Sequence, residues 1–309
     1  MRMWIGLIAL GLLASAADFP ETELSNGKVH AKLHLPDGVK GSYQGTRFDW
    51  AGIIYSLEYN GHQYFGKWYD KHEVKGHDSI TGTVEEFDSI GYAEAKPGGT
   101  FVRIGVGTVR KPAEQEYGRF KTYEIVDAGT RGMKKGKDYI IFTHKLSGAN
   151  SYDYAKTIRL TKTGFMVAHA LRNTSDRTME TEVYNHNFFV IDNEVVGPEM
   201  VVKFGFDPKP LADLKGMATI EGRELHYARE LQKGESVFTE FQGYGKSASD
   251  YNFEIQNKKS GAGVKIHADR PLSKVIFWSI NTVACPEPYV ALKIEPGKTA
   301  NWTITYDLY

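Results

Sequence analysis

Polar residues interrupt an otherwise apolar segment that runs from Val183 through Tyr-Asn-His-Asn-Phe-Phe-Val to Ile191. If the segment is a strand, alternation places Tyr184 and His186 on one face and the two asparagines on the other. A histidine can exchange a proton near neutral pH, so His186 is a candidate catalytic residue, and the neighbouring Asn185 is a candidate substrate-binding residue. The alternative is a core histidine bonded to neighbouring carbonyls, but burying so many polar groups without polar partners is costly.

A second segment places a carboxyl group between two prolines, Pro286 and Pro288. Proline restricts the backbone and cannot donate to a sheet ladder, so the pattern predicts Glu287 at a strand edge or in a turn. A rigidly held glutamate suits the role of a general base. An exposed loop glutamate is the alternative.

A third segment, residues 45–50, combines a cation, a carboxylate and an indole. Arg47 and Asp49 could hold sugar hydroxyls through paired hydrogen bonds, and Trp50 could stack on the apolar face of a sugar ring. An Arg47–Asp49 ion pair near the surface would explain the same residues equally well. Trp278 is a second indole that we expect in a wall facing the sugar.

The elements that must position these residues are strands. Alternating apolar residues, or β-branched and aromatic runs, are bounded by Gly, Asn, Asp and Lys turns along the whole chain, and Asn60-Gly61 is a strong hairpin signal. No linker or repeat divides residues 17–309. We therefore expect one all-β domain, a large antiparallel β-sandwich, with two stacked β-domains as the alternative. Polar residues 68–86 and 129–137 are the expected long loops. The main expected strands are 28–35, 53–59, 100–108, 139–143, 155–160, 165–173, 182–191, 237–241, 275–280 and 301–308.

Composition excludes several functions. The 309 residues include 38 Lys+Arg and 38 Asp+Glu, a formal net charge of zero, which argues against nucleic-acid binding and suits a neutral ligand better than a polyanion. The single cysteine, Cys285, rules out an internal disulfide and a thiolate zinc site. His30 and His34 would lie roughly 13 Å apart on a strand, too far to share a metal ion. No dinucleotide, ATP or zinc-protease motif is present, so we expect no metal and no cofactor.

The first sixteen residues have the layout of a secretory signal peptide. Arg2 precedes an apolar run from Trp4 to Leu13, and the small residues Ala14-Ser15-Ala16 follow. The run is short for a membrane span, and no later segment is apolar for long enough to be one. We expect residues 1–16 to be removed and the protein to be secreted or periplasmic. A buried N-terminal helix is the alternative.

Together, the Asn185-His-Asn-Phe-Phe189 and Cys285-Pro-Glu-Pro-Tyr289 segments, followed by Glu295-Pro-Gly-Lys at the start of the last strand, resemble the aldose 1-epimerase (galactose mutarotase) family. The resemblance implies the galactose mutarotase-like supersandwich, with a carbohydrate cleft on a concave face. It also implies that Glu287 takes the anomeric proton while His186 protonates the ring oxygen. That assignment needs an ionised glutamate beside a protonated histidine, a state their proximity would promote. The implied ligand is a mono- or oligosaccharide, and the oligomeric state stays open.

One position departs from the family pattern. Thr81 stands where the family usually has a second histidine, and His77 lies four residues earlier. Either His77 reaches the cleft from its loop and binds substrate, or the site is not a standard mutarotase. The usual Asn-Arg-Ile segment is also missing, and Arg47 could take over its sugar-holding role. Two other functions stay open on the same sandwich: a carbohydrate-binding protein without turnover, and a glycan lyase or hydrolase that uses Tyr184, His186 and Arg47.

Overall fold

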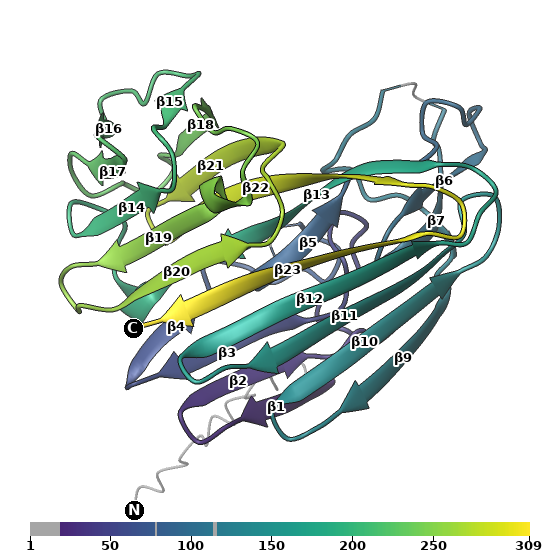
Figure 1. Cartoon of the computed structure of the whole chain (residues 1–309), viewed down its shortest axis with the longest axis horizontal. Coiled ribbons are helices and arrows are strands. Elements are labelled where there is room, and N and C mark those ends of the chain that lie inside the picture. Colours follow the sequence, from purple (N-terminus) through teal and green to yellow (C-terminus); the bar gives the residue numbers. More distant parts are fainter. Residues whose placement is uncertain (1–18, 78, 114–115) are drawn as a thin grey trace, which may run out of the picture.

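The computed structural model describes residues 19–77, 79–113 and 116–309, so the predicted signal peptide lies outside the described residues. The described chain folds into β-strands that form two large antiparallel sheets packed on each other, with two smaller sheets beside them (Figure 1). Two single-turn 3-10 helices, η1 (Ile191–Asn193) and η2 (Ala248–Asp250), interrupt the strands. The predicted all-β antiparallel sandwich is confirmed. No helix in the part of the chain that the structure describes is long and apolar enough to cross a membrane.

Within the described ranges, the strand order in space differs from the order along the chain. The ten-stranded sheet runs β16 (Ala218–Glu221), β17 (Glu224–Tyr227), β14 (Met200–Phe204), β19 (Asn252–Asn257), β20 (Gly263–Ala268), β23 (Thr299–Leu308), β12 (Gly164–Asn173), β11 (Tyr152–Leu160), β10 (Tyr139–Leu146), β9 (Thr130–Lys135). The six-stranded sheet runs β15 (Lys209–Pro210), β18 (Val237–Gln242), β21 (Lys274–Ile280), β22 (Val283–Ile294), β13 (Met179–Phe188), β5 (Gly82–Phe87). The four-stranded sheet runs β1 (Glu21–Ser25), β2 (Val29–His34), β3 (Ile53–Tyr59), β4 (His62–Phe65), and the three-stranded sheet runs β6 (Thr100–Arg103), β7 (Gly107–Arg110), β8 (Ile125–Asp127).

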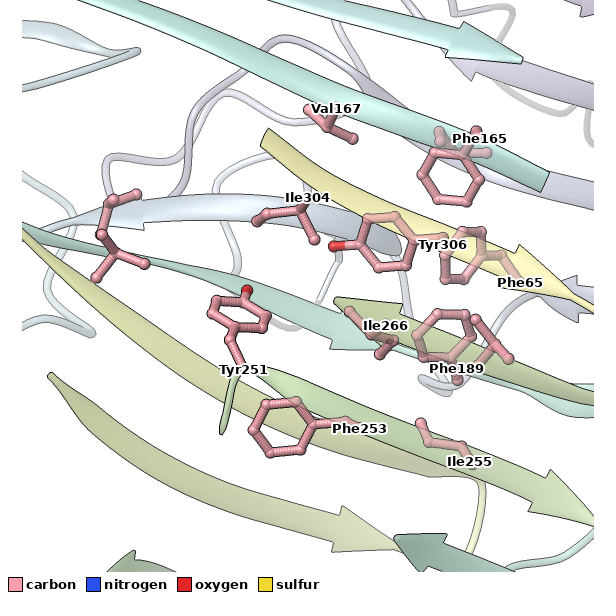
Figure 2. Close-up of a cluster of buried hydrophobic side chains, with 14 of the residues drawn as sticks. Phe65, Phe165, Val167, Phe189, Tyr251, Phe253, Ile255, Ile266, Ile304 and Tyr306 are labelled. Atoms are coloured by element: carbon pink, nitrogen blue, oxygen red, sulfur yellow. The ribbon is translucent and has the colours of Figure 1, made fainter. Parts of the chain in front are cut away.

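Aromatic and β-branched side chains fill the space between the two large sheets (Figure 2). Phe165 of β12 lies opposite Tyr306 of β23 in the strand register, and their rings stack with centroids 4.5 Å apart. Phe65 stacks on Phe189 in the same cluster at 4.8 Å. Burying one such side chain contributes about 1.5–3 kcal/mol, and the cluster as a whole contains residues of both large sheets, so its burial holds them together.

Two expected elements differ from the structure. The expected strand over residues 100–108 is divided into β6 and β7 by a turn in which Gly105 has a φ of +81°. Residues 129–137, expected as a loop, contain strand β9, which pairs with β10. The other expected loop, residues 68–86, ends earlier than expected, because residues 82–86 belong to strand β5; the remaining loop between β4 and β5 borders the cavity that contains His186 and Glu287.

Glu287 lies within β22, between β21 and β13 in the sheet order, so it is not in a turn or in an outermost strand, but at this position β22 pairs only with β21. The carbonyl of Tyr289 accepts from Ser273 on the β21 side, which directs the backbone groups of Pro286 and Pro288 toward β13. The ladder between β13 and β22 ends at the pair formed by Tyr184 and Tyr289. Both prolines lie past that point, where their missing N–H groups leave no ladder bond unmade.

Replacing Gly105 with alanine should destabilise the fold. A Cβ at this position would lie 2.5 Å from the Asp49 side chain, and the positive φ is unfavourable for any residue with a Cβ. The left-handed backbone costs about 1–2 kcal/mol and the overlap about 1–3 kcal/mol more. Urea unfolding should therefore show a larger loss for Gly105→Ala than for Gly222→Ala, whose positive φ has open space around it. Equal losses would show that the contact with Asp49 does not constrain the turn.

Candidate active site

His186 and Glu287 lie side by side at the centre of the site. Strand β13 presents His186 and β22 presents Glu287, with His186 Nε2 3.2 Å from Glu287 Oε1. Both residues are buried, each 4 % exposed. The Phe188 ring stacks on the imidazole at 3.8 Å, and Trp278 approaches its edge at 5.8 Å. Among the described residues His186 Nδ1 has no hydrogen-bond partner, so Glu287 alone determines which ring nitrogen carries the proton.

A cavity of about 450 Å³ opens onto this pair. Its walls come from the β2–β3, β4–β5, β7–β8 and β17–β18 loops and from strands of the six-stranded sheet. A second cavity of about 800 Å³ borders it and shares Trp68, His77, Ser236 and Trp278 with it. The lining residues of the first are Arg47, Trp68, His77, Arg119, Phe120, His186, Phe188, Ser236, Phe238, Ile276, Trp278 and Glu287.

Burial sets the protonation of the pair. It lowers the pKa of His186 well below the ordinary value, and the charges of Arg47 and Arg119 lower it further. Burial raises the pKa of Glu287 to about 8, although Arg47 opposes the shift. At neutral pH the pair therefore consists of a neutral imidazole and a protonated carboxyl group. This differs from the expected ionised pair, because burial disfavours the charged form of each group.

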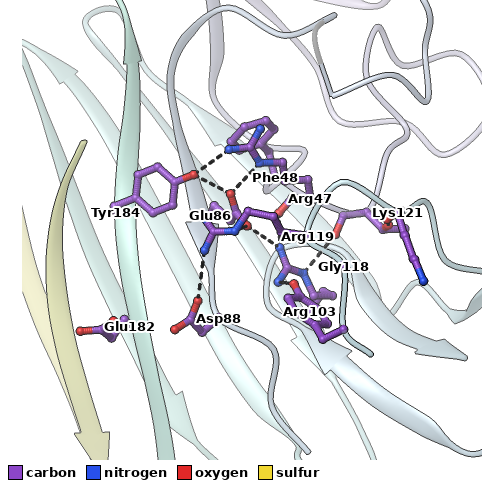
Figure 3. A network of polar contacts seen from close by, with 12 residues as sticks. Arg47, Phe48, Glu86, Asp88, Arg103, Gly118, Arg119, Lys121, Glu182 and Tyr184 are labelled. Atoms are coloured by element: carbon purple, nitrogen blue, oxygen red, sulfur yellow. Dashed lines mark hydrogen bonds and ion pairs between the residues drawn. The ribbon is translucent and has the colours of Figure 1, made fainter. Parts of the chain in front are cut away.

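A second buried carboxyl group, that of Glu86 in β5, lies behind the cavity wall, against Arg47 and Arg119 (Figure 3). Its Oε2 accepts from Arg47 Nε at 2.7 Å and from the Tyr184 hydroxyl at 2.5 Å. Arg103 and Arg119 approach its Oε1 at 3.4 Å and 3.7 Å. Burial would raise the pKa of Glu86, but these guanidinium groups hold it below its ordinary value. Glu86 is therefore a buried anion that holds arginines at the cavity wall.

Three of the expected substrate-binding residues lie at the cavity. Arg47 and Trp278 line it, and Trp278 lies between the two cavities. His77 also lines both, and its ring packs against Phe120 at 4.8 Å. His77 thus reaches the cavity from the β4–β5 loop. Thr81 points elsewhere and donates to the carbonyl of Gly66.

The other two expected substrate-binding residues lie away from this cavity. The Trp50 indole is 3 % exposed and donates to the carbonyl of Gly45 at 2.7 Å, so it is a core side chain. The Asn185 amide donates to Thr83 Oγ1 at 2.9 Å and to Glu85 Oε1 at 3.0 Å. It lies on the opposite face of β13 from His186, as the predicted alternation requires. Neither residue is in position to touch a sugar bound beside His186.

The alternative interpretation of residues 45–50, a surface ion pair between Arg47 and Asp49, is not what the structure has. Asp49 instead pairs with Lys156 at 2.7 Å, and both groups are buried. Sequence reasoning also missed Glu86, Arg119 and Trp68 as site residues. Glu86 lies in a segment that was expected to be a polar loop, and only the buried strand β5 makes its carboxylate conspicuous; nothing in the polar segment around Arg119 marked that residue. Among the described residues, no group of three or more His, Cys, Asp or Glu side chains is arranged to hold a metal ion.

The fold is similar to that of several solved structures. A galactose mutarotase-like protein from Clostridium acetobutylicum superposes with a TM-score of 0.59 at 14% identity, over 94% of this chain and 95% of that one. One from Lactobacillus casei gives 0.57 at 14% identity, over 94% and 100%. An aldose epimerase homologue from C. elegans gives 0.52 at 12% identity, over 95% and 99%. No protein-family model and no curated protein matches the sequence. The chain therefore has the galactose mutarotase-like fold that its motifs implied.

The raised pKa of Glu287 predicts that stability decreases with rising pH. The unfolded carboxyl group ionises above its ordinary value of 4.5, whereas the folded one keeps its proton up to about 8. The unfolded state therefore binds fewer protons in this window, and this contribution to stability is lost as pH rises through it. His186, with its lowered pKa, has the opposite effect, but only below its ordinary value of 6.5.

Between pH 6.5 and 8 the wild type should thus lose about 2 kcal/mol relative to Glu287→Gln, which keeps the shape without the titration. Urea unfolding of both proteins at the two pH values measures this difference. Parallel pH profiles for the two proteins would contradict the raised pKa.

Proposed function

We propose that the protein is a sugar 1-epimerase that interconverts the anomers of an aldose by opening and closing its ring. The observation that carries this proposal is the buried contact between His186 and Glu287 at the cavity. An anomer exchange needs one proton donor and one proton acceptor, both acting on oxygen. This pair supplies both. The fold, which the galactose mutarotase-like proteins share, supports the same proposal.

The resting pair holds one transferable proton. The family resemblance assigns the base role to Glu287 and the acid role to His186, which requires that proton to move from Glu287 to His186 Nε2 across the 3.2 Å contact. Glu287 then takes the proton of the anomeric hydroxyl while His186 gives one to the ring oxygen. The C1–O5 bond breaks, the aldehyde rotates, and closure on its other face returns both protons. The total number of protons is unchanged over the cycle.

The geometry places the sugar above the pair. The two groups touch, so no pyranose fits between them, and the ring must approach from the cavity side. A volume of about 450 Å³ is within the range of small-molecule sites. Trp278 and Phe120 offer apolar faces in its wall, on which a sugar ring can pack.

The alternatives have less support. A lyase would use Tyr184 as its base, but the Tyr184 hydroxyl donates to Glu86 and burial raises its pKa well above the ordinary value. A glycosidase needs two carboxyl groups across the substrate, and among the described residues that line this cavity only Glu287 carries one. A binding protein without turnover would use the same walls. We also propose that residues 17–309 act as one secreted or periplasmic domain, on the basis of the signal-peptide pattern.

Glu287→Gln should abolish most of the activity. Freshly dissolved α-anomers of glucose and galactose equilibrate slowly in buffer, and polarimetry measures the extra rate due to the protein. Removing the acid–base group should lower kcat/KM about 10²–10⁴-fold. The matched control is Glu224→Gln, which removes the carboxylate of the more exposed pair that Glu224 forms with His226 at 2.9 Å, and it should keep the wild-type rate.

Rates equal to those in buffer across a panel of sugars would contradict the proposed reaction. Glycan binding in the same samples would then favour the binding protein. New reducing ends or ultraviolet absorbance from unsaturated products would favour a glycan-cleaving enzyme.

A further inference from the structure

The wall of the cavity carries more positive than negative charge. Two guanidinium groups, those of Arg47 and Arg119, line it, whereas Glu287 is the one carboxyl group among its described lining residues. Glu287 and His186 together hold one transferable proton, so the pair contributes no net charge in either of its proton arrangements. The charge facing a ligand therefore depends on how completely nearby carboxylates outside the cavity neutralise the two arginines.

The carboxylates near these arginines neutralise them only in part. Three arginines share the single buried carboxylate of Glu86, which offsets one positive charge. Asp88, 45 % exposed, offsets part of another from 3.9 Å. The nearby Lys274 has its own partner in Glu182 at 3.2 Å, so it neither adds to nor removes the excess. About one positive charge remains beside the cavity.

Of the three arginines, Arg119 has the weakest contacts with carboxylates of the protein and the most exposed side chain. Its nitrogens lie 3.7 Å from Glu86 and 3.9 Å from Asp88, both longer than a hydrogen bond. Its Nη1 donates to the neutral hydroxyl of Tyr289 at 3.2 Å. Its side chain is 29 % exposed, compared with 9 % for Arg47 and 2 % for Arg103. Figure 3 shows Arg119 between Glu86 and Asp88, with which it forms ion pairs.

Arg47 also has donor capacity to spare. Its Nε and Nη2 bond to Glu86 and Tyr184, and among the described residues its Nη1 has no hydrogen-bond partner. Stabilising Glu86 does not require Arg119, because Arg47 at 2.7 Å and Arg103 already pair with that carboxylate. A third arginine adds desolvation cost, and its hydrogen bond goes to the neutral hydroxyl of Tyr289 and not to a carboxylate. The position of Arg119 is explained if a bound ligand supplies an anionic group for it to bind.

We propose that the sugar bound in this cavity is anionic, and that its carboxylate or phosphate group is held by Arg119 with help from the free edge of Arg47. The inference rests on the proposed function for the nature of the ligand and adds its substrate class. A planar guanidinium binds the oxygens of either anion with paired hydrogen bonds. The zero net charge of the whole chain does not bear on this choice, because the excess is local to one wall.

The test compares sugars that differ only in the acidic group. Anomer exchange above the rate in buffer alone is measured for glucose against glucuronate, galactose against galacturonate, and glucose against glucose 6-phosphate. We expect kcat/KM to be at least about tenfold higher for one class of acidic sugar than for its neutral partner, as charge-assisted hydrogen bonds provide. The preferred acidic class identifies carboxylate or phosphate. Added salt should reduce the preference.

Variants assign the preference to Arg119. Arg119→Gln should reduce the ratio of acidic to neutral kcat/KM about tenfold, and Arg119→Lys should retain part of it. The control Arg110→Gln removes an arginine that pairs with the exposed Glu124 away from the cavity, and should leave the ratio unchanged. Circular dichroism and thermal melting verify that each variant is folded. A wild-type ratio near one for all three pairs, or a ratio that Arg119→Gln does not change, would overturn the inference.

A failure of the proposed reaction is separable from a failure of this inference. Calorimetric titration of the wild type with glucuronate, glucose 6-phosphate and glucose measures binding whether or not turnover occurs. Tighter binding of an acidic sugar, weakened by Arg119→Gln, supports the inference even if no anomer exchange is catalysed. Equal binding of the acidic and neutral sugars, or binding of none of them, overturns it.

Discussion

The requirement that buried charges be paired governs how this site is built. Glu85 and Glu86 are consecutive and buried in β5, and alternation sends their side chains to opposite faces of the sheet. Glu85 pairs with Lys156 and bonds to His169 at 2.8 Å, both from the ten-stranded sheet. It thus links the two large sheets. Glu86 forms ion pairs with the arginines beside the cavity. Removing the cations from either side would leave a buried carboxylate unpaired, which is strongly destabilising.

These networks hold the strand that carries the proposed catalytic histidine. Asn185 bonds to Glu85 inside the sandwich, and Tyr184 bonds to Glu86 on the cavity side. His186 follows directly, so the backbone before it is fixed from both faces of β13. Its imidazole is then left with Phe188 and Glu287 as close neighbours, in surroundings that keep it neutral. Rigid support outside the reacting pair keeps its geometry, while burial sets its protonation.

Strand alternation and short motifs predicted those features of the site that depend on residues close together in the sequence. Alternation placed Tyr184 and His186 on one face and Asn185 on the other, and the two motifs placed Glu287 with His186. What the sequence could not show depends on long-range packing. The Trp50 indole donates a hydrogen bond to the carbonyl of Gly45, and the guanidinium of Arg131 lies 4.6 Å from the centre of its ring. The prolines beside Glu287 fit a central strand because the ladder between β13 and β22 ends there. The proposed role of Arg119 in binding an anion depends on its distance from Glu86, which the sequence does not show.

The central claim is that His186 and Glu287 act as one proton-transferring unit. A double-mutant cycle tests it most directly, with NMR magnetisation exchange between the α and β anomers at equilibrium measured for His186→Gln, Glu287→Gln and the double variant. A single unit predicts that each single variant loses nearly as much rate as the double variant. Losses that multiply, or a single variant that keeps the wild-type exchange rate, would contradict the account.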